Sequence, residues 1–199
     1  GIDVLISAPQ KGWSASPCCA LIMLSKAARD RVEATTSTSF AADLKKWLHV
    51  MHAYESGGHM YHATMPTGAL AAFRDAMLET VGRGLELLKD RQWELGNRVR
   101  ALMTRKGLRS VAAPGFEAPG VVVCYTDDDQ MHNGRKFIEL GLQTASGVPL
   151  MCDEPADYKT FRVGLFGLDK LQDTDRAVSN LDKALSAIAA HSATTTPVA

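Results

Sequence analysis

The sequence predicts a mixed α/β protein, and two kinds of pattern predict it. Short apolar runs such as Val4-Leu5-Ile6 and Leu21-Ile22-Met23-Leu24 have the length and composition of buried strands. The segment from Thr67 to about Lys106 instead repeats apolar residues at spacings of three and four, which is typical of a helix. After Gly107 the pattern changes to short alternating strands and helices. A chain of 199 residues can form one domain or two small ones.

The elements before Thr67 are expected to be short. Buried strands are expected at residues 2–7 and 19–24, and helices at residues 26–33 and 43–54. The pair Gly57-Gly58 ends the second of these helices.

The helical pattern over residues 67–106 is long for a globular domain. Gly82 and Gly84 weaken its centre and predict a bend, and Gly107 is a natural C-terminal stop. Beyond it we expect strands at 108–112, 121–126, 148–152 and 160–165, helices at 133–142 and 174–190, and a disordered polar tail at 191–199.

Composition excludes several classes of function. Lysine and arginine total 22 and so do aspartate and glutamate, so the net charge points to neither a nucleic-acid nor a membrane partner. No apolar run approaches the ~20 residues that a membrane helix needs. The cysteines have no paired metal-ligand spacing and His59 and His62 lack further ligands, so we expect no metal site. Reduced thiols in the cytoplasm are the simplest account of the four cysteines.

Lys11 is the strongest candidate for chemistry. It follows the strand at residues 2–7, and open α/β sheets bind ligands beyond the carboxyl ends of their strands. A lysine held there among apolar neighbours is harder to keep protonated, and a neutral amine attacks a carbonyl to form a Schiff base. The alternative is a solvated loop lysine. The amide of Gln10 can donate a hydrogen bond beside it, or can be ordinary turn polarity.

Three further side chains can bind anions. Tyr61 and Thr64 precede Pro66, which favours an extended or turning segment, and their hydroxyls can donate to a phosphate. The alternative is a capping threonine and a half-buried tyrosine. Arg162 lies in an apolar strand, where a guanidinium needs an anionic partner and matches a carboxylate bidentately. Its alternative role is a structural ion pair with Asp157 or Glu154.

Together these residues resemble class V aminotransferases. The resemblance runs from Gly1 to about Ala190. Within this family the chain is most similar to the alanine–glyoxylate and serine–pyruvate group. The matching segments, in order, are Ser7-x-x-Gln10-Lys11-Gly12, Met60-Tyr61-His62-Ala63-Thr64-Met65-Pro66 and Phe161-Arg162-Val163-Gly164-Leu165-Phe166-Gly167. The chain departs from the family at Ser16-Pro17-Cys18, which replaces a Pro-Pro-Gly-like turn.

The resemblance implies a fold and a cofactor. It implies pyridoxal phosphate (PLP) fold type I, with the end of the large domain at 1–66, a linking helix at 67–106 and a small α+β domain at 107–190. Lys11 would form the internal aldimine with PLP, and Gln10, Tyr61 and Thr64 would bind the phosphate, the last two across a homodimer. Arg162 would hold the substrate carboxylate.

The function that the resemblance implies is transamination of alanine or serine with glyoxylate or pyruvate. The chain starts Gly1-Ile2-Asp3 without Met, so we expect the C-terminal half of a longer enzyme, inactive alone, rather than a trimmed complete chain. One alternative is a folded fragment that serves only domain or dimer packing. Another is a cysteine desulfurase-like enzyme, which Gln10 argues against because such an enzyme would carry His before the lysine.

Overall fold

A computed structural model of the chain describes residues 1–194, with side chains to 191. The chain divides into two compact units, Gly1–Leu78 and the part from Glu79 onward, which we call the N-terminal and C-terminal units. The boundary falls inside helix α3 (Thr67–Arg83). Each unit is described by itself.

The N-terminal unit begins with a two-stranded antiparallel sheet. Strands β1 (Val4–Ser7) and β2 (Leu21–Leu24) pair in a register that sets Val4 opposite Leu24 and Ser7 opposite Leu21. Residues 8–20 therefore connect two paired strands, and we call them the β1–β2 connection. Helices α1 (Lys26–Glu33) and α2 (Leu44–Glu55) follow, and the expectation of both helices is confirmed.

Local side chains fix where these helices start. The Ser25 hydroxyl accepts a hydrogen bond from Ala28 N at the start of α1, and the Asp43 carboxylate accepts one from Lys46 N at the start of α2. Such caps satisfy backbone N–H groups that have no partner within the helix.

The expected burial of the first two strands is wrong. The side chains of Leu5 and Ile6 are 51% and 68% exposed, and Met23 on the partner strand is 45% exposed. A sheet of two strands has two edges, and here the strands hydrogen-bond only to each other. Their apolar side chains therefore remain largely in solvent.

The long helix expected over residues 67–106 is two helices. Helix α3 ends at Arg83 and helix α4 runs from Leu85 to Arg105. Gly84 separates them with φ of 91°, a left-handed conformation that only glycine adopts at low cost. The bend predicted from Gly82 and Gly84 is thus a complete break at Gly84.

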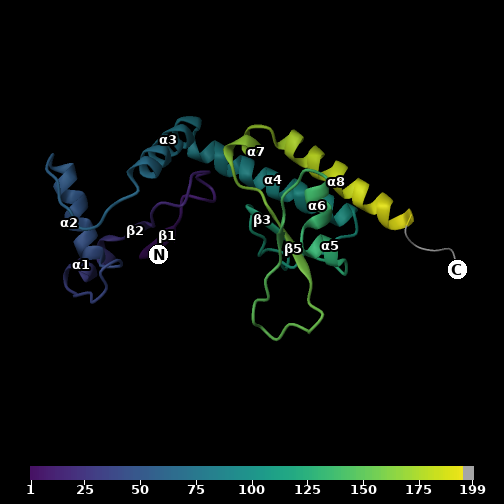
Figure 1. Ribbon diagram of the computed structural model, residues 1–199, viewed down its shortest axis with the longest axis horizontal. Coiled ribbons are helices and arrows are strands. Elements are labelled where there is room, and N and C mark those ends of the chain that lie inside the picture. The colour runs from purple at the N-terminus through teal and green to yellow at the C-terminus, as the bar shows by residue number, and fades with distance from the viewer. Residues whose placement is uncertain (195–199) are drawn as a thin grey trace. The chain divides into compact units, whose positions relative to one another are not determined.

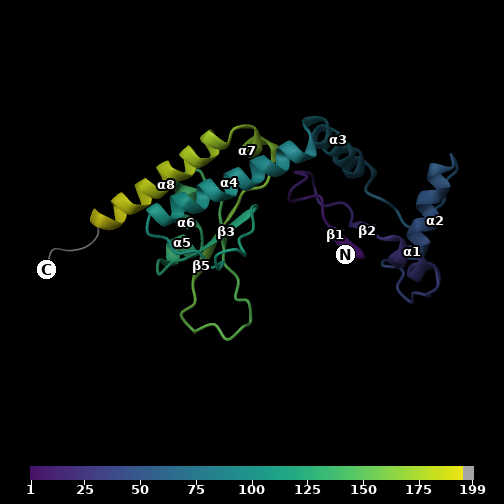
Figure 2. The same ribbon diagram turned by 180° about the vertical axis from the view of Figure 1, so that it is seen from behind.

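The C-terminal unit contains a three-stranded antiparallel sheet in the order β3-β5-β4, with Val121 opposite Gly164 and Ala145 opposite Arg162. Helices α4 and α8 run side by side in both views, and α4 packs on β3 (Figure 1 and Figure 2). The bounds of the elements are β3 Val121–Tyr125, α5 Asp129–His132, α6 Arg135–Glu139, β4 Ala145–Ser146, β5 Thr160–Gly164, α7 Leu168–Gln172 and α8 Thr174–Thr194.

The main core of the described residues lies in this unit. Its members come from α4, β3, β5 and α8, together with α5, α6 and α7, and include Leu95, Val99, Leu102, Val122, Phe137, Phe161, Leu181 and Leu185. Phe137 and Phe161 stack with ring centroids 5.2 Å apart, which anchors α6 on β5.

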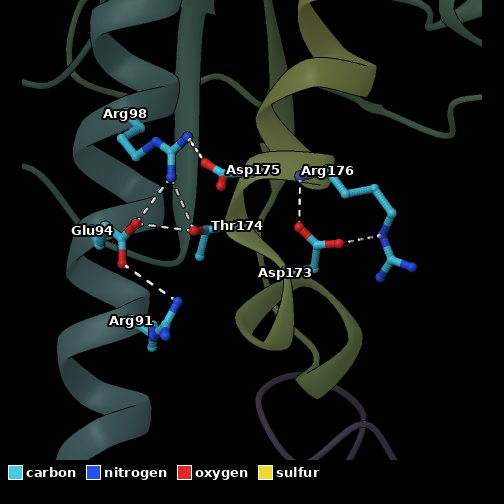
Figure 3. Close-up of polar contacts among 7 residues, drawn as sticks. All are labelled: Arg91, Glu94, Arg98, Asp173, Thr174, Asp175 and Arg176. Carbon is cyan, nitrogen blue, oxygen red and sulfur yellow. Dashed lines mark hydrogen bonds and ion pairs between the residues drawn. The ribbon is translucent and has the colours of Figure 1, made fainter.

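Polar contacts tie α4 to the start of α8 (Figure 3). The buried Thr174 hydroxyl donates to Glu94 Oε1 at 2.9 Å and accepts from Arg98 at 3.0 Å. Arg98 also donates to Glu94 at 2.9 Å and to Asp175 at 2.5 Å. We call these four residues the α4–α8 network.

Three expectations for this unit need correction. Residues 108–112 form a single bridge, Ser110 to Cys124, and not a strand. The helix expected at 133–142 is shorter and corresponds to α6 at Arg135–Glu139, while α5 before it was not predicted. Gly134, whose φ is 80°, separates the two helices. Residues 148–152 are a loop, and the third strand of the sheet is instead β4.

The strands expected at 121–126 and 160–165 are confirmed as β3 and β5. The last helix extends to Thr194, four residues beyond its expected end. It thus includes the start of the tail expected to be disordered, and the rest of that tail, residues 195–199, lies outside the described residues.

Candidate active site

Lys11 lies on the β1–β2 connection, in an irregular stretch after the end of β1. Its side chain is exposed and, within residues 1–194, forms no hydrogen bond or ion pair. The expected apolar surroundings of the lysine are therefore not present in this structure. What the structure provides is an uncommitted primary amine at the exit of a strand.

Two contacts hold the connection in place. Pro9 is fully buried, and its carbonyl accepts a hydrogen bond from Ala15 N at 3.2 Å. The Trp13 ring packs edge-on against Phe73 of α3 with centroids 6.1 Å apart. These contacts flank Lys11 and Gln10, both of which are exposed. The sequence reasoning missed Trp13 because its ring partner lies 60 positions further along the chain.

Tyr61 and Thr64 lie together on the segment that enters α3. The Tyr61 hydroxyl is 3.3 Å from Thr64 Oγ1, and both side chains are exposed. Within the described residues neither hydroxyl contacts Gln10 or Lys11 of the same chain. A paired phenol and alcohol facing solvent can donate to an anion that another molecule brings.

His62 anchors this segment. Its ring stacks on Phe40 at 4.3 Å and packs edge-on against Trp47 of α2 at 4.9 Å, and its Nε2 lies 3.1 Å from the Phe40 carbonyl oxygen. His62 therefore fixes the backbone between Tyr61 and Thr64. Its place inside a short motif was visible in the sequence, but its aromatic partners were not.

Arg162 lies at the centre of β5, between Val123 of β3 and Ala145 of β4. Its side chain is half-buried, and its Nε donates to the Ser146 carbonyl oxygen at 2.8 Å. Within the described residues the two terminal nitrogens of the guanidinium have no hydrogen-bond partner. The edge of the guanidinium formed by its two terminal nitrogens, which can bind a carboxylate bidentately, is thus uncommitted.

The alternative ion pairs of Arg162 are not formed in the described part of the chain. The Glu154 carboxylate instead accepts hydrogen bonds from the backbone of Leu150 and Cys152 and shapes the loop at 148–154. Asp157 is exposed and makes no ion pair with Arg162. The arginine is held in place by one backbone contact and not by a structural carboxylate.

A cavity of about 540 Å³ lies elsewhere in the C-terminal unit. Residues of the loop at 147–158 line it, together with His132 and Thr160. None of the five candidate site residues lines this cavity. Cys152 is exposed on the same loop and does not line the cavity.

Among residues 1–194 no group of three or more His, Cys, Asp or Glu side chains is arranged to hold a metal ion. The same residues contain no helix that is both long and apolar enough to cross a membrane. Lys11, Gln10, Tyr61 and Thr64 belong to the N-terminal unit, and Arg162 belongs to the C-terminal unit.

The donor set fits PLP in its chemistry. PLP has an aldehyde that a lysine amine can bind covalently and a phosphate that hydroxyl and amide donors can bind. The structure supplies an uncommitted amine at Lys11, an exposed hydroxyl pair at Tyr61 and Thr64, and an exposed amide at Gln10. The free guanidinium edge of Arg162 matches the carboxylate of an amino acid.

Comparisons with known proteins find aminotransferases, which also use the chemistry that this donor set fits. The chain is 27% identical over 194 residues to an alanine–glyoxylate aminotransferase of Oryctolagus cuniculus, with 93% of this chain and 47% of the relative covered. It is 28% identical over 185 residues to a 2-aminoethylphosphonate–pyruvate transaminase of Pseudomonas putida, with 90% and 48% covered. No family model matches the chain.

Solved structures agree on the fold. An aspartate aminotransferase of Thermus thermophilus superposes with a TM-score of 0.71 at 20% identity, covering 94% of this chain and 50% of the other. An alanine–glyoxylate aminotransferase of Nostoc sp. superposes with a TM-score of 0.67 at 19% identity, covering 93% of this chain and 48% of the other. These likenesses establish the fold.

The fold is therefore that of PLP-dependent enzymes of fold type I, as the sequence predicts. Within that class the chain is similar to class V aminotransferases along nearly its whole length, in agreement with the resemblance that its motifs show. The chain spans about half the length of the curated relatives it matches.

Proposed function

We propose that this chain forms part of a PLP-dependent aminotransferase in which Lys11 binds the cofactor. The observation that carries the proposal is the uncommitted amine of Lys11 on a connection anchored by Pro9 and Trp13. It occurs in a chain related to aminotransferases over 93% of its length. PLP supplies an electron sink for the bond that breaks at the substrate α-carbon.

Each candidate residue has a defined task in this proposal. Lys11 Nζ would hold the cofactor through its aldehyde and, when free, would act as the base that removes the proton from the substrate α-carbon. The terminal nitrogens of Arg162 bind the substrate carboxylate and orient the α-carbon. Gln10, Tyr61 and Thr64 donate hydrogen bonds to the phosphate.

We propose alanine or serine as the amino donor and glyoxylate or pyruvate as the acceptor. The names of the relatives support this choice, because one acts on alanine and glyoxylate and another on pyruvate. A homodimer is part of the proposal, since Tyr61 and Thr64 face solvent and do not contact Lys11 of their own chain. Four free cysteines are consistent with a reduced cytoplasmic setting.

Reductive labelling tests the proposed role of Lys11. The parent enzyme is mixed with PLP, reduced with borohydride and mapped by peptide mass spectrometry. We expect the label on Lys11, with loss of tryptic cleavage after that residue. Lys26, an exposed lysine paired with Asp30, is the internal control and should remain unlabelled. A label on another lysine would contradict the assignment.

Visible absorbance separates this function from the alternative of a packing module. After unbound PLP is removed by gel filtration, a protein that holds PLP on a lysine stays yellow, and a module that serves only packing is colourless. The Lys11→Ala variant of the parent enzyme should lose the colour, whereas Lys26→Ala should keep it.

A further inference from the structure

The β1–β2 connection carries a second pair of reactive groups besides Lys11. Cys18 and Cys19 are neighbours in sequence, both are half-buried, and neither is in a disulfide. The Cys18 thiol donates to Cys19 Sγ at 3.9 Å. Adjacent side chains of a regular strand point to opposite faces, so the irregular backbone here is what brings the two sulfur atoms together.

Their separation is that of two sulfur ligands on one central atom. Two thiolates bound at about 2.3 Å to a tetrahedral zinc lie roughly 3.8 Å apart. A pyramidal centre with narrower bond angles brings the two sulfur atoms somewhat closer, and rotation about the Cα–Cβ bonds of two half-buried side chains can supply that change. A direct disulfide between them is less suitable, since it needs an S–S distance of about 2.0 Å and a Cα separation above ~4.4 Å. Neighbouring Cα atoms lie only about 3.8 Å apart across a trans peptide. The geometry favours a bridging atom over an S–S bond.

The bridging atom must need only two protein ligands. A closed zinc site takes four ligands, and the described residues contain no cluster of three or more metal-binding side chains. A monosubstituted trivalent arsenical keeps one carbon substituent and has two bonds available for sulfur. We propose that Cys18 and Cys19 form a dithiol site that binds monosubstituted trivalent arsenicals. This site goes beyond the proposed aminotransferase function and does not depend on it.

The binding step is a condensation that needs no oxidant or reductant. With phenylarsine oxide, each thiol gives its proton to the oxygen on arsenic and each sulfur forms a bond to arsenic. The arsenic–oxygen bonds break and one molecule of water leaves. Arsenic remains trivalent and both sulfurs keep their oxidation state.

The other two cysteines make the site selective. Cys124 has no exposed surface, and burial raises its pKa to about 11, so its thiol is both inaccessible and protonated. Cys152 is exposed but has no second thiol beside it in the described residues. A single sulfur–arsenic bond exchanges readily with a free monothiol, whereas a two-sulfur chelate is held until a competing dithiol removes it.

Mass spectrometry of the 199-residue chain tests the proposal. The reduced chain is mixed with one equivalent of phenylarsine oxide and then with a large excess of 2-mercaptoethanol. We expect one phenylarsenic group per chain to remain bound and to be released by ethane-1,2-dithiol. Trypsin cleaves after Lys11 and Lys26, so the adduct should be found on peptide 12–26, which contains both sulfurs. An adduct on another peptide, or none that resists the monothiol, overturns the proposal.

Variants sharpen the test. Cys18→Ser and Cys19→Ser should each lower the retained adduct at least tenfold, while the matched control Cys152→Ser should retain it in full. Far-UV circular dichroism confirms that the variants stay folded, and the peptide map of the unsubstituted chain does not depend on them. Retention in either Cys18→Ser or Cys19→Ser, or loss in Cys152→Ser, counts against the dithiol site.

Discussion

Arg162 stands in the middle of a three-stranded sheet with only one of its guanidinium nitrogens bonded to the protein. A half-buried guanidinium is costly unless an anion completes it. No carboxylate in the described residues does so, which leaves the terminal nitrogens for a ligand. This contrasts with Arg98, whose terminal nitrogens are taken by Glu94, Thr174 and Asp175.

Replacing Arg162 with lysine separates ligand binding from fold support. Arg162→Lys keeps the charge but loses the planar fork, and a charge-assisted bidentate pair is worth about 2–3 kcal/mol. We expect kcat/KM of the parent enzyme to fall by more than tenfold, with little change in Tm. Arg176→Lys, at an exposed arginine of α8, is the control and should change neither quantity. Full activity with a collapsed Tm would assign Arg162 to the fold instead.

At the scale of elements, the α4–α8 network joins two helices that contribute much of the core. The hydrogen bond from Thr174, followed by the one from Arg98, lowers the pKa of Glu94 below its usual range. A carboxyl whose pKa is lower in the folded state stabilises the fold above its unfolded pKa of about 4.3. That contribution is lost as the pH falls through the lower folded pKa.

Acid denaturation tests the network. Below about pH 4.3 we expect the free energy of unfolding of the unsubstituted chain to fall more steeply than that of Glu94→Gln, since only the former takes up a proton at this site. The matched control is Glu86→Gln on the same helix, whose carboxyl is 84% exposed and pairs only with Lys89. Equal acid slopes for Glu94→Gln and the unsubstituted chain would show that the network does not perturb Glu94.

Packing between α4 and the loop before β3 depends on a glycine. A Cβ on Gly96 would lie 2.7 Å from the Pro119 carbonyl oxygen, whereas one on Gly82 would meet nothing within 4 Å. We expect Gly96→Ala to destabilise the chain by about 1–3 kcal/mol through overpacking of the backbone contact. Gly82→Ala should be neutral or stabilise by up to about 1 kcal/mol. Urea denaturation of both variants measures the difference, and equal stability would contradict the predicted clash.

The sequence predicted an element correctly where its backbone hydrogen bonds come from regular pairing, and it failed where a side chain takes those bonds. Strands β3 and β5 pair with each other over five residues, so their apolar pattern was sufficient to locate them. The run at 148–152 has a similar pattern, but the carboxylate of Glu154 takes backbone N–H groups that a strand would need. Such local competition by a side chain leaves no trace in hydrophobic periodicity.

The sequence could predict which residues belong to the candidate site, but not how they are held in place. Short motifs indicated Lys11, Tyr61, Thr64 and Arg162, and their roles stay predictions. The supports of those residues were not visible, because Phe40 reaches His62 and Trp13 reaches Phe73 across long stretches of chain. A motif shows which atoms are available for chemistry, whereas their placement depends on contacts that only the folded chain contains.

At the scale of the whole molecule, the two units differ in how well they are packed. The C-terminal unit contains the main core of the described residues. In the N-terminal unit, fully or nearly fully buried side chains are limited to Pro9 and Phe73 among the described residues, and β1 and β2 form a sheet of only two strands. A sheet of two strands is marginally stable at best without further packing. Lys11 therefore lies on the unit with fewer buried side chains among the described residues.

We expect the 199-residue chain alone to be catalytically silent for this reason. PLP acts as an efficient electron sink when protein groups fix its plane and tune its ring, and such positioning requires a rigid site. In the N-terminal unit the amine of Lys11 is exposed, and the strands beside it have largely exposed apolar side chains. The test mixes the purified chain with PLP, alanine and glyoxylate and follows pyruvate. Turnover on the order of 1 s⁻¹ or faster, the range of ordinary enzymes, would mean that these 199 residues form a complete cofactor site.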